Sequence, residues 1–312
     1  MVAVLVLDPI HEDGLALLRA RTDIALDYLP EPDTHDIAAH LCEAEVLLLR
    51  GRTLPRAMFE GAERLRLISR HGVGCDNLDL DLLRAQGVRV AISADANWLS
   101  VAEHTLALMF AAAKALHVGD RAVREGRWAV RDALGTREIA GSDVLVVGYG
   151  RIGRAVAERC AALGARVRVH DPAFAETPPF AAAPALSEAM AEADFVTIHI
   201  PRLPATMGLI GADLLRRLRP GAVLVNTARG GIVDEGAVLA ALETGRLARY
   251  ATDVLADEPP APDDPLLARD DVILTPHSAA MTAEAARRMA TGAAENILDF
   301  IDGRLAPEMA VI

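Results

Sequence analysis

The chain has 312 residues, room for two domains of ordinary size, and 52% of them are hydrophobic, which is enough for buried cores. Its net charge of −12 argues against nucleic acid or an anionic membrane as the main partner. An anionic substrate would therefore need a local cationic site, because the overall field repels it.

Neither a leader peptide nor a membrane span is expected. The apolar run at residues 2–7 ends at Asp8 and Pro9 and has no basic residue before it, unlike a signal peptide. The longest apolar stretch, residues 101–118, contains charged and histidine side chains. The three cysteines are far apart and form no C-x-x-C pair, which fits a reducing, cytoplasmic compartment. We expect all three to be buried and inert.

Short apolar runs alternate with helix-period segments along the whole chain. In the first half they predict strands at residues 2–7, 24–28, 46–49, 65–68 and 88–92, with helices such as 14–20 and 79–85 between them. In the second half they predict strands at residues 144–147, 167–170, 195–200, 222–226, 250–254 and 272–275. This alternation predicts an α/β fold with two Rossmann-like, doubly wound parallel sheets.

A glycine motif follows the first of the later strands. Gly148, Gly150 and Gly153 lie between the apolar run and a helical pattern, where glycines provide a tight turn, close approach of the backbone to a pyrophosphate, and close helix packing. A helix that begins near Arg151 and Ile152 would offer free N–H groups and its dipole to phosphates. The motif predicts a bound dinucleotide; a purely structural turn is the alternative.

Asp171 ends the next apolar run, 18 residues after Gly153. This is the spacing of a carboxylate that binds the adenosine ribose, although a simple turn residue before Pro172 is the alternative. A carboxylate there repels a 2′-phosphate, so NAD is favoured over NADP. Arg168 and His170 are nearby cations that soften this preference.

Two long helical stretches, residues 99–124 and 282–302, predict how the domains are joined. If the second stretch returns to the first half, residues 1–98 plus 285–312 form a substrate domain and residues 99–284 form the dinucleotide-binding domain. We expect the active-site cleft to lie between the two domains, where ligand sites are common.

Reactive side chains follow three further strands. Arg229, Glu258 and His277 each come after the end of a predicted strand, and ligands of doubly wound sheets bind beyond those ends. Arginine can hold a carboxylate with two hydrogen bonds, and histidine can move a proton near neutral pH. A carboxylate bonded to the histidine would favour its charged form. Taken singly, Arg229 is also compatible with a surface cation and Glu258 with a solvated acid.

Six ordered motifs cover nearly the whole chain: HGVGCDN at 71–77, SVAEH at 100–104, GYGRIG at 148–153 with Asp171, NTARGGIVD at 226–234, DVLADEP at 253–259, and TPH at 275–277. Together they resemble the D-isomer-specific 2-hydroxyacid dehydrogenase family. That family includes D-3-phosphoglycerate dehydrogenase, glyoxylate and hydroxypyruvate reductases, and D-lactate dehydrogenases. The resemblance implies an NAD-dependent oxidoreductase that interconverts a small 2-oxo acid and its D-2-hydroxy acid.

The resemblance implies roles for individual residues. Arg229 would bind the substrate carboxylate and the reacting carbonyl oxygen. His277 would be the general acid in reduction and the base in oxidation, paired with Glu258. The other substrate contacts implied are the backbone of Val73 and Gly74 and the side chains of Arg50 and Asn97. The cofactor contacts implied after later strands are Asp253, at the nicotinamide carboxamide, with Thr227 and Ala228 nearby, and His199, Pro201 and Thr206.

The segment Ser278–Met281 replaces the family's more usual glycine-containing stretch beside the substrate pocket, so the sequence leaves the 2-hydroxy acid open. A homodimer, packed through residues 99–124, is implied by the resemblance, and the scattered cysteines lead us to expect no metal site. Because the chain ends at Ile312, we expect no additional regulatory domain. Two rivals stay open: a formate dehydrogenase, whose relatives pair the histidine with glutamine rather than Glu258, and a dinucleotide-sensing scaffold or corepressor on the same fold.

Overall fold

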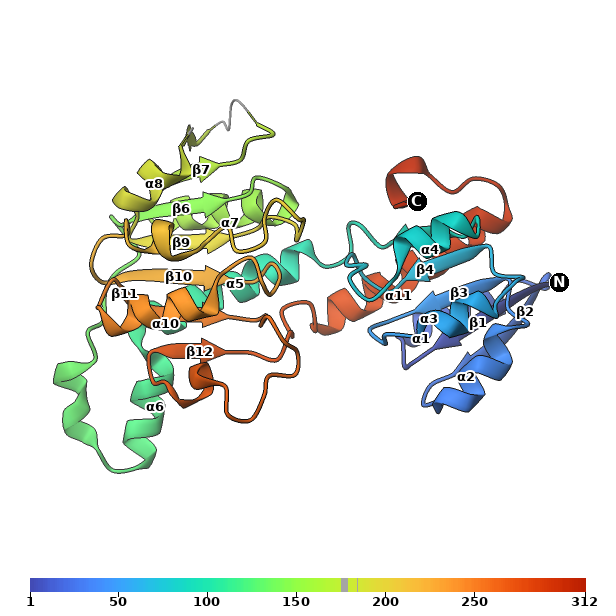
Figure 1. The fold of residues 1–312 in the computed structure, drawn as a ribbon, viewed down its shortest axis with the longest axis horizontal. Coiled ribbons are helices and arrows are strands. Elements are labelled where there is room, and N and C mark those ends of the chain that lie inside the picture. Colours follow the sequence, from blue (N-terminus) through green and yellow to red (C-terminus); the bar gives the residue numbers. More distant parts are fainter. Residues whose placement is uncertain (175–178, 184) are drawn as a thin grey trace. The chain divides into compact units, whose positions relative to one another are not determined.

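The computed structural model describes residues 1–174, 179–183 and 185–312. They form two compact units (Figure 1): unit 1 comprises Met1–Asn97 and Ala280–Ile312, and unit 2 comprises Trp98–Ala279. Each unit contains one sheet whose strands are all parallel, with helices on both faces. The predicted α/β fold with two doubly wound parallel sheets is confirmed.

Unit 1 has a five-stranded sheet in the order β2-β1-β3-β4-β5, a doubly wound order whose direction reverses between β1 and β3. Its strands are β1 (Val2–Leu7), β2 (Ile24–Leu29), β3 (Val46–Leu49), β4 (Leu67–Arg70) and β5 (Arg89–Ile92). Its helices are α1 (Glu12–Arg19), α2 (Thr34–Leu41), α3 (Arg56–Glu60), α4 (Leu80–Ala85), α11 (Ala283–Ile301) and the 3₁₀ turn η3 (Pro307–Met309).

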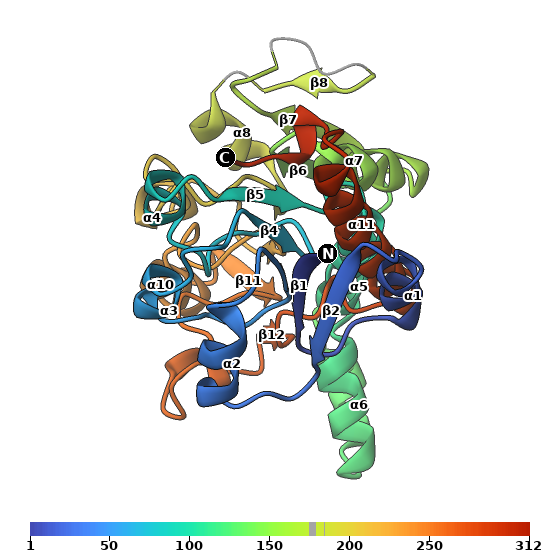
Figure 2. The ribbon, with the colours of Figure 1, turned by 90° about the vertical axis from the view of Figure 1, so that its right-hand side faces the viewer.

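The strands of unit 1 are continuous apolar runs because both faces of the sheet are covered. In β1, Leu5 and Leu7 join the core under α2, α3 and α4, whereas Val4 and Val6 join the core under α1 and α11. Helix α11, which follows the last strand of unit 2, packs beside α1 (Figure 2). The C-terminal helix therefore covers one face of the N-terminal sheet.

The strand predicted at residues 65–68 was wrong by two positions, since β4 ends at Arg70. Its last two residues are polar yet buried. Ser69 donates to the carbonyl of Ala293 at 2.8 Å, and Arg70 donates to the carbonyl of Leu49 at 2.9 Å. These hydrogen bonds offset the cost of burial, and a hydropathy pattern cannot reveal them.

Unit 2 has a seven-stranded sheet in the order β12-β11-β10-β9-β6-β7-β8, the Rossmann arrangement with its reversal between β6 and β9. The strands are β6 (Asp143–Val147), β7 (Arg166–His170), β8 (Ala181–Ala182), β9 (Phe195–Ile198), β10 (Ala222–Asn226), β11 (Leu247–Thr252) and β12 (Val272–Leu274). Its helices are α5 (Trp98–Lys114), α6 (Leu116–Arg124), α7 (Arg151–Ala162), α8 (Leu186–Glu192), α9 (Ala212–Leu215) and α10 (Glu235–Glu243), with 3₁₀ turns η1 (Trp128–Ala133) and η2 (Pro265–Ala268).

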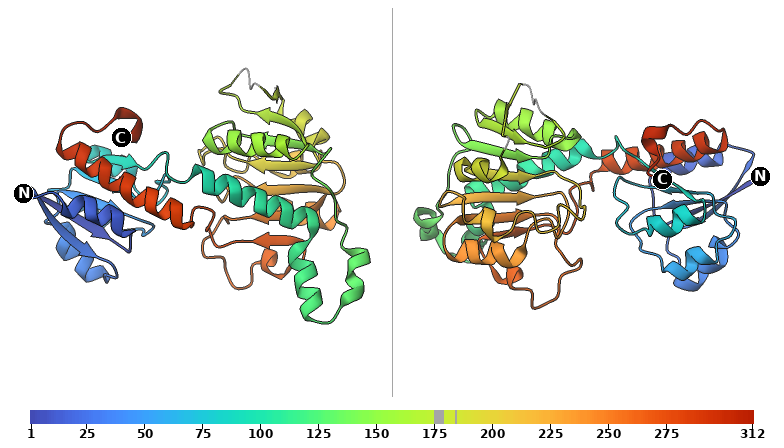
Figure 3. Two further views of the ribbon diagram at one scale, coloured as in Figure 1. Left: turned by 180° about the vertical axis from the view of Figure 1, so that it is seen from behind. Right: turned by 45° about the horizontal axis from the view of Figure 1, so that its top comes forward.

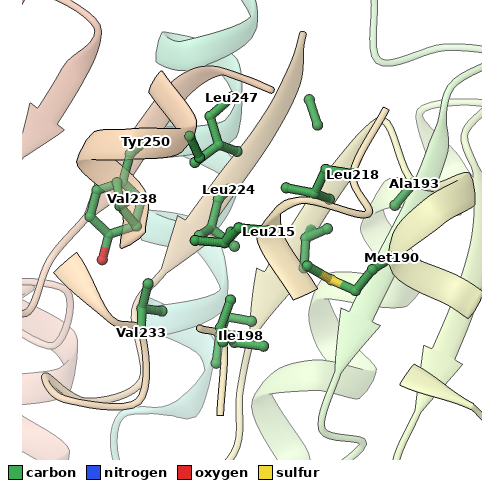
Figure 4. Packing of buried hydrophobic residues seen from close by; sticks show 14 of the residues in the cluster. Met190, Ala193, Ile198, Leu215, Leu218, Leu224, Val233, Val238, Leu247 and Tyr250 are labelled. Atoms are coloured by element: carbon green, nitrogen blue, oxygen red, sulfur yellow. The ribbon is translucent and has the colours of Figure 1, made fainter. Parts of the chain in front are cut away.

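Two cores hold the larger sheet. Helices α5 and α7 cover one face (Figure 3), with Val144 and Val146 of β6 beneath them. Helices α8, α9 and α10 cover the other face, where Leu215, Leu224 and Val238 pack together (Figure 4). The sheet that carries the strand ends is thus fixed from both sides.

The single helix expected over residues 99–124 was wrong. Ala115 has a left-handed φ of 50°, and it separates α5 from α6, whose axes differ by 61°. Helix α5 is largely buried, whereas α6 buries only Ala122. Within the described residues no single helix has the length and apolar character of a membrane span. Helices α5 and α6 have that length and apolar character only when they are taken together, as this bent pair.

The expectation that all three cysteines are buried was also wrong. Cys160 is buried in the core, and burial raises the pKa of its thiol to about 12, which keeps it unreactive. Cys75 is half-buried, and Cys42 is exposed because it caps the C-terminus of α2 at the surface.

The packing of α1 on α11 can be tested at Gly14. A Cβ atom there would lie 2.6 Å from the carbonyl oxygen of Ala290. We expect Gly14→Ala to lower the free energy of unfolding of unit 1 by about 1–3 kcal/mol through overpacking, measured by urea denaturation. Gly61→Ala is the control, because its Cβ would have no neighbour closer than 3.7 Å. Equal stability of the two variants would contradict the close packing.

Candidate active site

The glycine turn lies where the strand order of unit 2 reverses, between β6 and β9. Gly148 has a φ of 99°, and a Cβ on it would lie 2.5 Å from the carbonyl oxygen of His199, just after β9. A Cβ on Gly153 would lie 2.0 Å from the carbonyl oxygen of Gly148. Side chains are therefore excluded at both positions, which lets the turn lie against the neighbouring strand and α7 lie against the turn.

Gly150 differs from the other two glycines. It is the N-cap of α7, it makes no side-chain cap, and a Cβ on it would meet no atom of the described chain within 4 Å. Its backbone and the first N–H groups of α7, at Arg151 and Ile152, are those that a phosphate uses at a helix N-terminus. These residues fit the pyrophosphate of a dinucleotide.

Asp171 is tied to the glycine turn. Its Oδ2 accepts the N–H of Tyr149 at 2.7 Å, and its Oδ1 accepts the N–H of Ala173 at 2.9 Å. Two backbone donors therefore orient the carboxylate beside the motif, and a carboxylate has further acceptor positions for hydroxyl groups.

The two basic side chains near Asp171 have other partners. Arg168 donates to the carboxylate of Glu192 at 2.5 Å. The Nδ1 atom of His170 lies 2.7 Å from the carbonyl oxygen of Ala183, which makes it a donor. Neither interaction directs positive charge toward the Asp171 carboxylate.

The loop after β9 contains three of the predicted cofactor contacts. His199 has its Nε2 at 2.8 Å from Thr197, burial lowers its pKa to about 3, and it is neutral at pH 7. Among the described residues its buried Nδ1 has no partner. The hydroxyl of Thr206 accepts from the N–H of Leu203 at 2.8 Å and donates to the carbonyl of Pro201 at 2.7 Å, which closes the loop.

Arg229 lies in a loop that folds tightly after β10. Buried Asn226 accepts the N–H of Ala228 and donates to the carbonyl of Arg229, both at 3.0 Å. A Cβ on Gly230 would lie only 1.7 Å from the carbonyl oxygen of Leu255, so this loop lies directly against the segment after β11. These contacts fix the backbone from which the half-buried Arg229 extends, and its Nη1 donates to the carbonyl of Ala228 at 2.7 Å.

Glu258 and His277 are brought together. The Nδ1 atom of His277 lies 2.7 Å from Oε2 of Glu258, while Oε1 of Glu258 accepts the N–H of Leu255 at 2.9 Å. A carboxylate only accepts hydrogen bonds, so Nδ1 carries the proton and donates it. The arrangement orients the ring and presents Nε2 as the second proton-bearing position.

Asp253 holds the segment that contains His277. Three consecutive N–H groups converge on it: His277 donates to its carbonyl oxygen at 2.9 Å, Ser278 to Oδ1 at 2.8 Å and Ala279 to Oδ2 at 2.8 Å. The hydroxyl of Thr275 also donates to Oδ1 at 2.6 Å. This clamp maintains the left-handed φ of 51° at His277, a conformation that non-glycine residues seldom adopt.

The side chain of Asp253 is buried, at 1% exposure. Its contacts within the chain therefore explain its position without a ligand. The predicted contact with a nicotinamide carboxamide stays a prediction. Thr227 is buried as well, with its hydroxyl 2.7 Å from that of Thr105.

The predicted substrate contacts belong to unit 1. In the loop after β4, Arg70 donates to the carbonyl of Gly74 at 3.0 Å, and among the described residues the N–H groups of Val73 and Gly74 have no acceptor. Arg50 donates to the carbonyl of Pro9 at 2.9 Å, and Asn97 is half-buried at the end of its segment. The loop thus presents two amide donors.

Buried His71, in the same loop, has a pKa lowered to about 4, chiefly by burial and secondarily by the positive charge of Arg50. It is therefore neutral at physiological pH and adds no charge to this part of unit 1.

Sequence reasoning missed several supporting residues. Asn226 braces the arginine loop, and its position directly after a strand, where Asn favours turns, was an available signal. Glu235 accepts the N–H of Ala256 at 2.8 Å, and burial raises its pKa. In the described part of the chain no three His, Cys, Asp or Glu side chains form a group suited to a metal ion.

Known proteins resemble the chain over its whole length. D-3-phosphoglycerate dehydrogenase of Mycobacterium tuberculosis is 38% identical over 312 residues, covering 98% of this chain and 58% of that protein. The chain thus spans less than two thirds of the length of this curated relative.

Two solved structures are similar. NAD-dependent formate dehydrogenase from Staphylococcus aureus, in complex with NAD, is 27% identical with a TM-score of 0.89, covering 100% of this chain and 99% of that one. NADPH-dependent glyoxylate/hydroxypyruvate reductase from Sinorhizobium meliloti, in complex with citrate, is 26% identical with a TM-score of 0.87, covering 100% and 98%.

The sequence model described as "D-isomer specific 2-hydroxyacid dehydrogenase, NAD binding domain" matches residues 106–279. This region contains the glycine turn, Arg229, Glu258 and His277, and it lies within unit 2. The chain belongs to the D-isomer-specific 2-hydroxyacid dehydrogenase family.

Proposed function

We propose that the chain is an NAD(H)-dependent oxidoreductase that interconverts a small 2-oxo acid and its D-2-hydroxy acid. The observation that carries the proposal is the hydrogen bond of 2.7 Å between His277 and Glu258, in the unit that also contains the glycine turn. A histidine oriented by a carboxylate is suited to give and take a proton at a carbonyl oxygen. The family of the chain supports the same chemistry.

The nicotinamide cofactor, when bound, supplies or accepts the hydride. The amides around Gly150 would hold its pyrophosphate, and Asp171 would accept hydrogen bonds from the ribose hydroxyls. We propose NAD rather than NADP, because the carboxylate of Asp171 repels a 2′-phosphate and Arg168 is paired with Glu192. The similar structures include both an NAD and an NADPH enzyme, so the choice needs a direct measurement.

In reduction, the Nε2–H of His277 would protonate the developing alkoxide while Glu258 stabilises the positive ring. Arg229 would bind the substrate carboxylate and polarise the carbonyl group. In unit 1, the amides of Val73 and Gly74 and the side chains of Arg50 and Asn97 are proposed substrate contacts.

Two alternatives remain. The similarity to a formate dehydrogenase supports formate as a substrate, but formate oxidation releases no hydroxyl proton, and a His–Glu pair is a proton-transfer device. A dinucleotide-sensing scaffold would need the glycine turn, but it would have no use for the His277–Glu258 pair.

The deciding experiment follows reduced-nicotinamide absorbance with hydroxypyruvate, glyoxylate, pyruvate and phosphohydroxypyruvate, using NADH and NADPH side by side, and adds formate with NAD. We expect oxidation of NADH with at least one 2-oxo acid and none with formate. Turnover of formate alone would support the first alternative. Dinucleotide binding without any turnover would support the scaffold.

The cofactor site is tested at Gly150. Because a Cβ there meets no protein atom within 4 Å, Gly150→Ala should leave the melting temperature of the ligand-free protein unchanged. The added methyl group would occupy the path of the pyrophosphate, so we expect a loss of about tenfold or more in affinity for NADH, on the scale of one steric or hydrogen-bond defect. Titration by fluorescence measures it, and unchanged affinity would refute the placement.

Proton transfer is tested by His277→Ala. We expect kcat to fall by about 10²–10⁴-fold, the usual contribution of a positioned acid–base group, while NADH still binds. His35→Ala, at an exposed position on α2, is the matched control and should keep full activity. Near-normal turnover of the His277 variant would remove it from the mechanism.

We also propose a homodimer built on α6 and the turn that follows it. Leu116, Val123 and Trp128 are 56%, 55% and 67% exposed, an unusual arrangement for large apolar side chains. Light scattering should give twice the chain mass for the wild type, and Val123→Asp with Trp128→Ser should shift it toward the monomer. A monomeric wild type would contradict the proposed homodimer.

A further inference from the structure

A chain of hydrogen bonds connects α5 with the segment that contains His277. The Nε2 atom of His104 lies 3.0 Å from Oγ1 of Thr275, which in turn lies 2.6 Å from Oδ1 of Asp253. All of these residues belong to unit 2. The chain of bonds therefore starts on a helix and ends at the carboxylate that clamps the catalytic segment.

The direction of each hydrogen bond follows from the chemistry of the groups. A hydroxyl has one proton, and the short distance to the acceptor-only carboxylate shows that Thr275 donates it to Asp253. The oxygen of Thr275 must then accept from His104, so Nε2 of His104 carries a proton. Nε2 is also 3.5 Å from Oδ1 of Asp253, too far for a strong hydrogen bond, so the hydroxyl is the main link.

The helical end of this chain of bonds is rigid. The residues around His104 on α5, Val101, Ala102 and Leu108, are buried against the sheet, and α5 packs on β10, β11 and β12. The next residue, Thr105, donates to the carbonyl of Val101 at 2.8 Å and lies 2.7 Å from the hydroxyl of Thr227. Consecutive side chains of α5 thus bind the residues that follow β12 and β10.

We propose that His104 is a positioning residue for proton transfer at His277, acting through Thr275 and Asp253. The imidazole orients the Thr275 hydroxyl, and that hydroxyl holds the Asp253 carboxylate. The carboxylate in turn holds the two backbone amides that follow the left-handed His277. The inference rests on the proposed role of His277. It gives His104 a role beyond packing, because its contribution to this chain of bonds is the hydrogen bond from Nε2–H to Thr275.

The kinetic test compares His104→Leu, which removes the donor, with His104→Gln, whose amide nitrogen can reach the same place. We expect His104→Leu to lower kcat about 10- to 100-fold, because displacement by about 1 Å can cost 10²-fold. The affinity for NADH should be unchanged, and His104→Gln should restore most of kcat. Glu103→Gln, at the exposed neighbouring position, is the control and should behave as wild type.

Thr275 provides the second arm. Thr275→Val removes the hydroxyl at nearly constant shape and should lower kcat at least as much as His104→Leu, whereas Thr275→Ser should retain activity. Because both residues act through one chain of bonds, the double variant His104→Leu/Thr275→Val should be no slower than Thr275→Val alone. Additive losses, or no rescue by Gln and Ser, would overturn the inference.

A third readout needs no turnover. The N–H groups of Ser278 and Ala279 donate to the Asp253 carboxylate. We expect their hydrogen exchange, followed by NMR, to accelerate about tenfold in His104→Leu, as for the loss of one hydrogen bond. Unchanged exchange would refute the inference even in an active enzyme. If the wild type reduces no 2-oxo acid, the proposed function fails, while this readout still decides the positioning role.

Discussion

The buried carboxylate of Asp253 is the constraint on which the candidate active site depends. Burying a charge is costly unless hydrogen bonds replace the lost water. Here two amides and a hydroxyl supply them, and its own carbonyl accepts a third amide. The hydrogen bonds that satisfy the buried carboxylate also fix the backbone after His277, and therefore the place of its ring.

Parallel topology explains why distant residues of unit 2 can cooperate. Each strand of its sheet ends at the same edge, and the order reverses between β6 and β9. The glycine turn, the Arg229 loop and the Glu258–His277 pair all follow strand ends. Glycines at 148, 153 and 230 let these loops approach neighbouring backbone more closely than any side chain would permit.

Much of the fold followed from the sequence, since strands buried on both faces are continuous apolar runs. Strands β1, β3 and β10 were predicted at their observed limits. The shift of β4 was not visible, because its buried Ser69 and Arg70 depend on carbonyl acceptors far away in the chain. The break at Ala115 was missed as well, since alanine favours a continuous helix and only its left-handed φ ends α5.

The sequence pointed to the candidate reactive residues, but it did not reveal the hydrogen bonds that hold them in place. Motif order pointed to Arg229, Glu258 and His277, and the structure joins the last two. The clamp by Asp253 links residues 22, 25 and 26 positions apart, and such pairings depend on which strands are adjacent. The same is true of His104, whose partner Thr275 is 171 residues away.

The most direct test of this chemistry is a single turnover with NADH deuterated at the transferred C4 position, followed by analysis of the product on a chiral column. We expect deuterium at C2 of the D-2-hydroxy acid formed from at least one of the 2-oxo acids. A hydroxy acid without the label, or of the L configuration, would contradict hydride transfer in the proposed geometry, and absence of product from every 2-oxo acid would contradict the activity itself.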